Sequence, residues 1–113
     1  METGEPAVIY GNVRNRDLLP GVPDDCCVEV PCLVDRTGVW PTPVPEYPSH
    51  LAAFNRPYVN VVEMTVRAVL EQRPDLVRVA AMLDPNAGAT LSLDEIDAMC
   101  EELTAAHGDA LPA

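Results

Sequence analysis

The stretch "DDCCVEVPCLVD", residues 24–35, governs the interpretation of the N-terminal half because three of the chain's four cysteines fall within it. In a β-strand, side chains alternate between the two faces of the sheet. One face would then carry Cys26, Val28, Val30 and Cys32. Cys27 and Glu29 would point to the opposite face. The alternation predicts a half-buried strand.

Three uses of these cysteines are open: a metal site, a redox pair, or small buried side chains. Cys26 and Cys32 would lie roughly 20 Å apart on an extended strand. Zinc–sulfur bonds are about 2.3 Å long, so one ion cannot bind both. The spacing is not the C-x-x-C of redox pairs. A structural role is therefore favoured, since free cysteine behaves as a small hydrophobic side chain.

Further strands are predicted on either side of this stretch. "AVIYGN" (7–12) is β-prone, and "RNRDLLPGVPDD" (14–25) is punctuated as a loop. The turn signal "DRTG" (35–38) leads into "VWPTPV" (39–44), which predicts a hairpin with the opening stretch. Prolines lack a ladder donor, so three of them favour sheet edges or bends: Pro31, Pro41 and Pro43.

After Pro48 the apolar period changes from two residues to about 3.6, which indicates helices. "SHLAAFN" (49–55) is interpreted as a short turn. Pro57 suits the first turn of a helix, so we expect a break near residues 55–56. The helix that follows carries an apolar stripe of Val59, Val62, Val66 and Val69 or Leu70.

Two more helices complete the prediction. One runs from Pro74 to before Pro85. The last begins at an S-x-x-E capping box, Ser92 with Glu95, and ends at Gly108. Short mixed or antiparallel strands followed by three helices make an α+β fold, predicted as a single domain over residues 1–113.

Composition excludes several classes of function. With 7 basic residues and a net charge of −11, the chain lacks the basic surface needed to bind nucleic acid or an anionic membrane. No apolar run approaches the roughly 20 residues that span a bilayer, and we expect a cytoplasmic protein with reduced thiols.

The segment "DPNAGATLSLDE" (84–95) partly matches a calcium-binding loop. Oxygen-bearing side chains stand at template positions one, three, seven, nine and twelve: Asp84, Asn86, Thr90, Ser92 and Glu95. Gly88 and Ala89 occupy the positions that require an oxygen ligand and a glycine. The alternative, which we favour, is that these side chains cap helices. His50 and His107 have no catalytic partner nearby in sequence, and no nucleotide-phosphate loop is present.

The chain resembles the C-terminal region of glycoside hydrolase family 4, in its α-glucosidase/α-galactosidase branch, from about Tyr10 to Leu111. The most specific motifs are "VEVPC" (28–32) with "VDR" (34–36), then "MLDP" (82–85) and "SLDEI" (92–96). The resemblance implies a C-terminal fold like that of lactate dehydrogenases.

The resemblance implies a parent enzyme about four times longer than this chain. Such enzymes bind NAD on an N-terminal Rossmann domain and also bind a manganese ion. They hydrolyse O-glycosyl bonds by oxidation at C3, elimination and rehydration, an exception among glycosidases. None of the family's catalytic, NAD-binding or metal-binding residues falls within the matching region. We therefore expect this chain alone to bind neither NAD nor manganese and to be inactive.

The resemblance implies that this chain supplies the fold of the C-terminal region, a subunit interface and part of the sugar pocket. Asn12 and Asn15 of "GNVRN" are the candidates for proximity to substrate. Arg16 and Asp17 stand where relatives often have glycine. The expected partners are the Rossmann half of the parent enzyme, as the same or another chain, and a second copy in a symmetric dimer. The alternative is a stand-alone structural or interaction module without catalysis.

Overall fold

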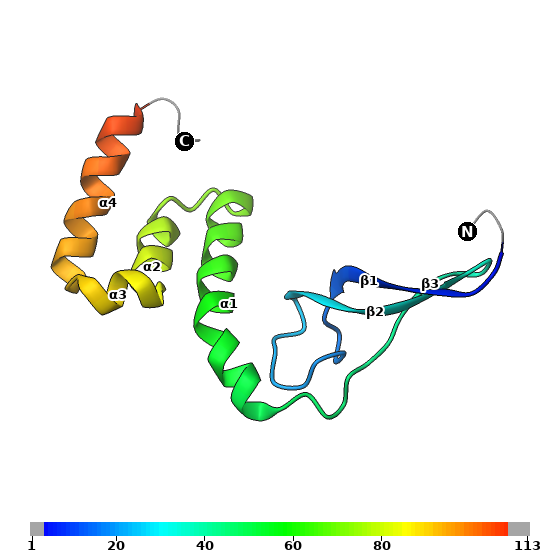
Figure 1. Cartoon of the computed structure of the whole chain (residues 1–113). Coiled ribbons are helices and arrows are strands. Elements are labelled where there is room, and N and C mark those ends of the chain that lie inside the picture. The colour runs from blue at the N-terminus through cyan, green and yellow to red at the C-terminus, as the bar shows by residue number, and fades with distance from the viewer. Residues whose placement is uncertain (1–3, 109–113) are drawn as a thin grey trace. The chain divides into compact units, whose positions relative to one another are not determined.

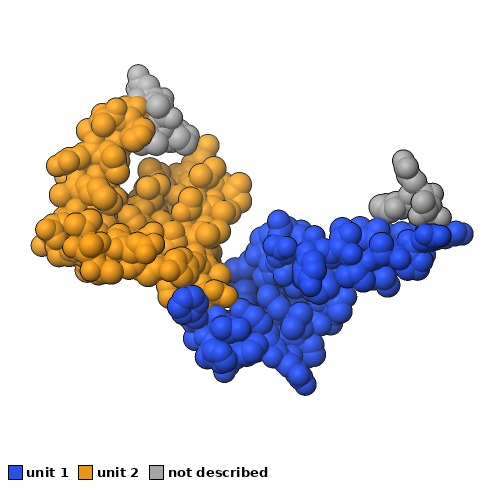
Figure 2. Space-filling model, viewed as in Figure 1, with its two compact units in different colours: residues 1–54 blue, residues 55–113 orange. Residues whose placement is uncertain are grey.

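A computed structural model describes residues 4–108. They group into two compact units, which divide between Phe54 and Asn55 (Figure 2). The first unit holds strands β1 (Ala7–Arg14), β2 (Cys27–Asp35) and β3 (Gly38–Pro41). Helix α1 (Ser49–Leu70) begins in the first unit and continues into the second. The second unit also contains α2 (Asp75–Leu83), α3 (Pro85–Thr90) and α4 (Leu93–His107) (Figure 1). The α+β class is confirmed, and the extent of a single domain stays a prediction.

The strands form one antiparallel sheet in the order β1-β2-β3. The register pairs Gly11 with Val30 across β1 and β2, and Leu33 with Trp40 across β2 and β3. The predicted hairpin is confirmed, because β2 ends at Asp35 and β3 begins at Gly38. Within that turn the Asp35 carboxylate accepts bonds from the Thr37 hydroxyl and backbone N–H, which lower the pKa of Asp35.

One face of β2 forms the core of the first unit, as the alternation predicts. Val28, Val30 and Cys32 are buried, whereas Cys27 and Glu29 on the other face are exposed. Loop residues fold back over the buried face, namely Leu18, Leu19 and Val22. The sheet therefore has one covered face and one open face.

Pro31 lies in the central strand, which corrects the expectation that it would mark a sheet edge. In an antiparallel strand the N–H and C=O of one residue point to the same side. The Pro31 carbonyl accepts a bond of 2.8 Å from Thr42 N–H, just past the end of β3. The N–H that Pro31 lacks would have pointed to the same side, where β3 has already ended. The pairing of β2 with β1 therefore loses no hydrogen bond.

The predicted break near residues 55–56 is wrong, and so is the short turn over 49–55. Helix α1 runs without interruption through Pro57. A proline inside a helix removes one bond, here to the Ala53 carbonyl, and crowds the preceding turn at a cost of about 3 kcal/mol. The helix continues on both sides because that penalty is confined to one turn.

The second unit has three complete helices and the larger part of α1, so the chain contains four helices within residues 4–108 rather than the predicted three. The additional helix is α3, which lies between the two predicted helices, in a segment where no helix was predicted. The unit buries five small or medium apolar side chains: Ala68, Leu76, Ala80, Ile96 and Cys100. Arg78 of α2 ties α2 to α4 by donating to Asp97 at 2.5 Å and Glu101 at 3.3 Å.

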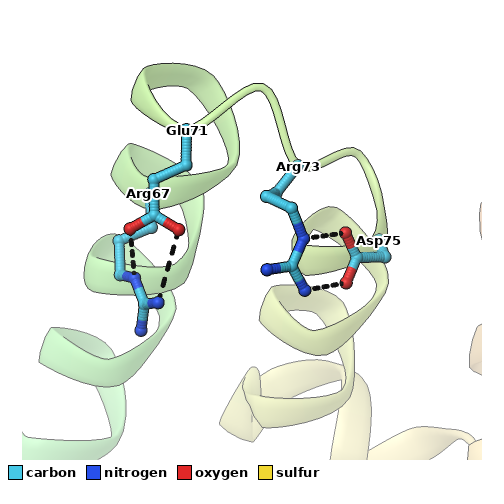
Figure 3. Close-up of polar contacts among 4 residues, drawn as sticks. All are labelled: Arg67, Glu71, Arg73 and Asp75. Atoms are coloured by element: carbon cyan, nitrogen blue, oxygen red, sulfur yellow. Dashed lines mark hydrogen bonds and ion pairs between the residues drawn. The ribbon is translucent and has the colours of Figure 1, made fainter.

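Helix α1 ends at a residue with positive φ, and two ion pairs lie beside this end. Gln72 has a φ of 53°, and Arg73 N–H donates to the Ala68 carbonyl at 2.9 Å, as in a Schellman motif. Arg67 pairs with Glu71 on the last turn of α1, and Arg73 with Asp75 at the start of α2 (Figure 3). These contacts set the sharp reversal between α1 and α2.

The apolar stripe predicted on α1 is on a helix, but most of it is not buried. Val62, Val66, Val69 and Leu70 are all exposed. Only Ala68 of this helix enters the buried set of the second unit. Among residues 4–108, no helix is long and apolar enough to cross a bilayer.

Replacing Gln72 with glycine should stabilise the chain. A residue with a side chain pays a steric cost at positive φ that glycine avoids, so we expect the free energy of unfolding to rise by about 0.5–1 kcal/mol. Urea unfolding followed by the helical circular dichroism signal measures this. Gln72→Ala, which keeps a Cβ, is the control and should give no such gain. A lower stability of Gln72→Gly would contradict the assigned helix end.

Candidate functional site

Asn15, one of the two candidates for proximity to substrate, is fully buried. Its side-chain oxygen accepts from Leu19 N–H at 2.7 Å. Its amide nitrogen donates to the carbonyl of Leu19 at 3.1 Å and to that of Val22 at 2.8 Å. The amide's oxygen and both of its hydrogens therefore bond to the backbone of the loop.

The backbone of Asn15 fixes the same loop. Asn15 N–H donates to the Cys26 carbonyl at 2.8 Å, and Leu18 N–H donates to the Asn15 carbonyl at 2.8 Å. Arg14 and Asp25 pair across the base of the loop. A single residue thus holds the loop between β1 and β2 at its start, middle and end.

Arg16 and Asp17 turn the chain immediately after Asn15. Both have positive φ, 40° and 63°, in the region that favours glycine. The loop therefore forms without glycine at these two positions, at a steric cost of about 1–2 kcal/mol for each such residue. The loop then returns through Gly21 (φ 80°), where an added Cβ would stand 3.1 Å from the Cβ of Ala52.

Asn12, the other candidate, lies on the open face of the sheet. It is exposed on β1 and paired in register with Glu29 of β2. Tyr10, Leu33 and Trp40 share this face by register, and all three are exposed. Asn12 can therefore reach a ligand or another polypeptide segment, whereas the side chain of Asn15 is already committed. The proximity of either residue to substrate stays a prediction.

The four cysteines lie in different settings. Cys32 is fully buried and directs its Sγ to the Val30 carbonyl at 3.4 Å, and Cys100 is buried in the second unit. Cys26 is half-buried and Cys27 is exposed. Residues 4–108 contain no group of three or more His, Cys, Asp or Glu side chains able to hold a metal ion.

The calcium-loop alternative is wrong, because α3 occupies the segment. Asp84 caps α3 by accepting from the N–H groups of Asn86 and Ala87, at 2.7 and 3.2 Å. The Thr90 hydroxyl donates to the Asn86 carbonyl. Asp84 and Thr90 thus bond to the backbone of α3, and Ser92 and Glu95 bond to each other at the start of α4.

The predicted capping box is confirmed at the start of α4. Glu95 Oε2 accepts from Ser92 N–H at 2.8 Å and from the Ser92 hydroxyl at 2.8 Å. The backbone bond first, and then the side-chain bond, lower the pKa of Glu95 from its ordinary value of 4.5. At the other end, His107 Nδ1 lies 2.7 Å from the Leu103 carbonyl, so this histidine belongs to the helix end.

Asn15→Ala should destabilise the first unit by about 2–4 kcal/mol, because three buried hydrogen bonds to loop backbone are lost together. Trp40, the only tryptophan, lies on β3 and reports unfolding of this unit by fluorescence. The matched control is Asn12→Ala, which should change stability by less than about 0.5 kcal/mol because its side chain is exposed. Equal effects of the two substitutions would refute the role of Asn15.

The capping box should weaken in acid. The pKa of Glu95 is lower in the folded chain than its ordinary value of 4.5, so its stabilisation is complete above pH 4.5 and disappears as the pH falls through the folded pKa. Titration of the Glu95 carboxyl carbon by NMR measures this pKa. Ser92→Ala should raise it only part of the way, because the backbone donor remains. A folded pKa at or above 4.5 would show that the box is not formed.

Comparison with known proteins gives concordant matches. The model of the family 4 glycosyl hydrolase C-terminal domain matches residues 1–87. An alpha-galactosidase of Bacillus subtilis (strain 168) is 45% identical over 112 residues, which cover 99% of this chain and 26% of that protein. An alpha-galactosidase of Rhizobium meliloti (strain 1021) is 32% identical over 112 residues, 99% of this chain and 23% of that protein.

A solved structure shows a similar fold. It is a 6-phospho-alpha-glucosidase from gut microorganisms in complex with NAD and glucose-6-phosphate, with a TM-score of 0.78 and 19% identity. The similarity covers 98% of this chain and 24% of that one, so this chain spans about a quarter of the length of the proteins it matches. The chain belongs to the family 4 glycosyl hydrolases and corresponds to their C-terminal domain.

Proposed function

We propose that this chain is the C-terminal domain of an α-glycosidase that acts on α-galactosides and uses NAD and manganese. The observation that carries the proposal is the 45% identity to a Bacillus subtilis alpha-galactosidase over 112 residues. The Rhizobium meliloti relative is also an alpha-galactosidase, which favours galactosides over glucosides.

The residues of this chain do not themselves form a binding site for NAD or for manganese. Residues 4–108 lack a cluster of potential metal ligands, and the sequence has no glycine-rich phosphate loop. The part of the enzyme that this chain does not span would therefore bind NAD and manganese and carry out the bond cleavage. The role of this chain is to shape and support one side of that site.

The open face of the sheet is the surface that we assign to the rest of the enzyme. Val8 and Trp40 both lie opposite Leu33 in register, and Tyr10 lies one row away opposite Pro31. Val8, Tyr10, Leu33 and Trp40 are all exposed, so these side chains form an apolar surface without cover from the described residues. Since the Bacillus subtilis relative contains nearly four times as much polypeptide as the matching region, the rest of the enzyme is the occupant we propose.

Asn12 lies on this same face, at the end nearer the loop that Asn15 holds. When the face is covered, Asn12 would lie at the junction between the two parts of the enzyme. Substrate pockets often form at such junctions. The cytoplasmic location and the absence of nucleic-acid and membrane partners stay predictions.

A chimera tests the proposal directly. The C-terminal region of the Bacillus subtilis alpha-galactosidase would be replaced by this chain, and hydrolysis of p-nitrophenyl α-galactoside would be measured with NAD and Mn²⁺. We expect activity from the chimera and none from the truncated enzyme or from the isolated chain, which lacks the catalytic part.

Two variants make the result specific. Trp40→Glu on the open face should lower the chimera's activity at least tenfold, because it buries an unpaired charge at the junction. Leu103→Glu, at an exposed position of α4, is the matched control and should leave activity unchanged. A folded but inactive chimera would favour the stand-alone module instead, and turnover by the isolated chain would contradict the division of roles.

A further inference from the structure

Helix α1 passes from one compact unit into the other. All three strands lie in the first unit, and α2, α3 and α4 lie in the second. The boundary falls between Phe54 and Asn55, within the second turn of α1 (Figure 2). A helix therefore connects the units, and its stiffness at this point governs how freely one unit can turn against the other.

Pro57 removes one of the hydrogen bonds that would cross this boundary. In an α-helix each N–H donates to the carbonyl four residues earlier, but proline has no N–H. The Ala53 carbonyl therefore lacks its helical donor, and the ring of Pro57 crowds the same carbonyl. Ala53 lies in the first unit and Pro57 in the second. The helix is continuous here, but it is weakest where it passes between the units.

The side chains around this boundary are exposed. The exposed residues are consecutive, namely Ala53, Phe54, Asn55 and Arg56. Successive residues are about 100° apart around a helix, so these four point to every side of it. The described residues therefore bury no side of α1 along this turn, and a change in the direction of the helix here would not disrupt a core.

The buried residues of α1 lie on either side of this segment. Ala52 is buried in the first unit, where an added Cβ at Gly21 would stand 3.1 Å from its Cβ. Ala68 is buried in the second unit, and its carbonyl accepts from Arg73 N–H at 2.9 Å. Between Ala52 and Ala68 no residue of α1 is buried. The segment around Pro57 thus links two anchored parts of the helix without belonging to either core.

We propose that residues 53–57 of α1 form a hinge, about which the two units turn as separate bodies. Hinges absorb a rotation through φ and ψ changes in a few residues. Because the bond to the Ala53 carbonyl is already missing, bending here breaks fewer hydrogen bonds than bending elsewhere in the interior of α1. Arg56 Nε donates to Asn60 Oδ1 at 2.9 Å across Pro57, but this exposed contact lies on one side of the helix only.

The hinge has a consequence for the apolar surfaces that the units leave uncovered. The first unit carries the open face of the sheet, and the second carries Val62, Val66 and Val69 of α1, all exposed. A rigid α1 would present these surfaces at one fixed angle, whereas a hinge lets each surface dock separately on the polypeptide that covers it. That consequence rests on the proposed function, but the hinge itself rests only on the structure of α1.

Residual dipolar couplings of the backbone amides test the hinge on the full 113-residue chain in a weakly aligning medium. A rigid molecule gives both units the same magnitude and rhombicity of alignment, whereas units joined by a hinge align to different degrees. We expect different values from the three strands and from α2, α3 and α4 of the wild-type chain. Equal magnitude and rhombicity for the two sets would overturn the proposal.

Pro57→Ala is the decisive variant, because it restores the missing donor and removes the crowding ring. The two units should then align equally. Pro85→Ala is the matched control: Pro85 is the first residue of α3, where a missing N–H costs no bond, so the units should stay differently aligned. Circular dichroism checks that both variants are folded. Units that stay differently aligned in Pro57→Ala would contradict a hinge at residues 53–57.

Hydrogen exchange gives a second measurement. Helical geometry makes Tyr58 N–H the donor to the Phe54 carbonyl across the boundary, so bending at the hinge should expose it. Its exchange should slow by about tenfold or more in Pro57→Ala, with a smaller change at Met64 further along α1. Equal exchange at Tyr58 in the two chains would show that the helix does not open around Pro57. None of these results depends on the activity of the chimera, so failure of the hinge and failure of the glycosidase proposal are distinguishable.

Discussion

The first unit depends on the side chain of a single buried asparagine. Asn15 has no access to solvent, and its amide bonds only to the backbone of Leu19 and Val22. These bonds hold the loop in the shape that lays Leu18, Leu19 and Val22 over the buried face of β2. Without that cover, Val28 and Val30 would be exposed and the sheet would have two open faces. The burial of the β2 face therefore depends on the hydrogen bonds that Asn15 makes to the loop.

Much of this architecture could be predicted from the sequence, because the signals were local. The alternation of Val28, Val30 and Cys32 predicted the buried face, and Ser92 with Glu95 predicted the start of α4. Three errors came from treating proline as a breaker of regular structure. Pro57 lies inside α1, Pro31 lies in the central strand, and Asp84-Pro85 begins a helix as well as ending one. Pro31 and Pro85 occupy positions where the missing N–H costs no bond, whereas at Pro57 the helix loses one bond and continues. Only the three-dimensional arrangement distinguishes these cases.

The candidate site was harder to predict. Asn12 and Asn15 were selected together, yet one is exposed on a strand and the other is completely buried. A sequence signal for Asn15 did exist, because asparagine side chains in loops commonly bond to the backbone of their own loop. The burial of Asn15 could not be predicted from the neighbouring sequence. It depends on the loop folding onto a strand more than ten residues away in sequence. The uncovered apolar surfaces were likewise invisible to the sequence pattern, which identifies an apolar face but not its partner.

These surfaces fit a domain that completes its packing with other polypeptide. The open face of the sheet carries aromatic residues beside Asn12, and the exposed side of α1 carries Val62, Val66 and Val69. The chain must form the loop between β1 and β2 before it can support any other part of an enzyme. Hydrogen exchange of the Leu19 amide, which donates to Asn15 Oδ1 at 2.7 Å, tests this most directly. Slow exchange in the isolated chain, lost in Asn15→Ala, is the expected result; exchange as fast as in an unstructured peptide would contradict it.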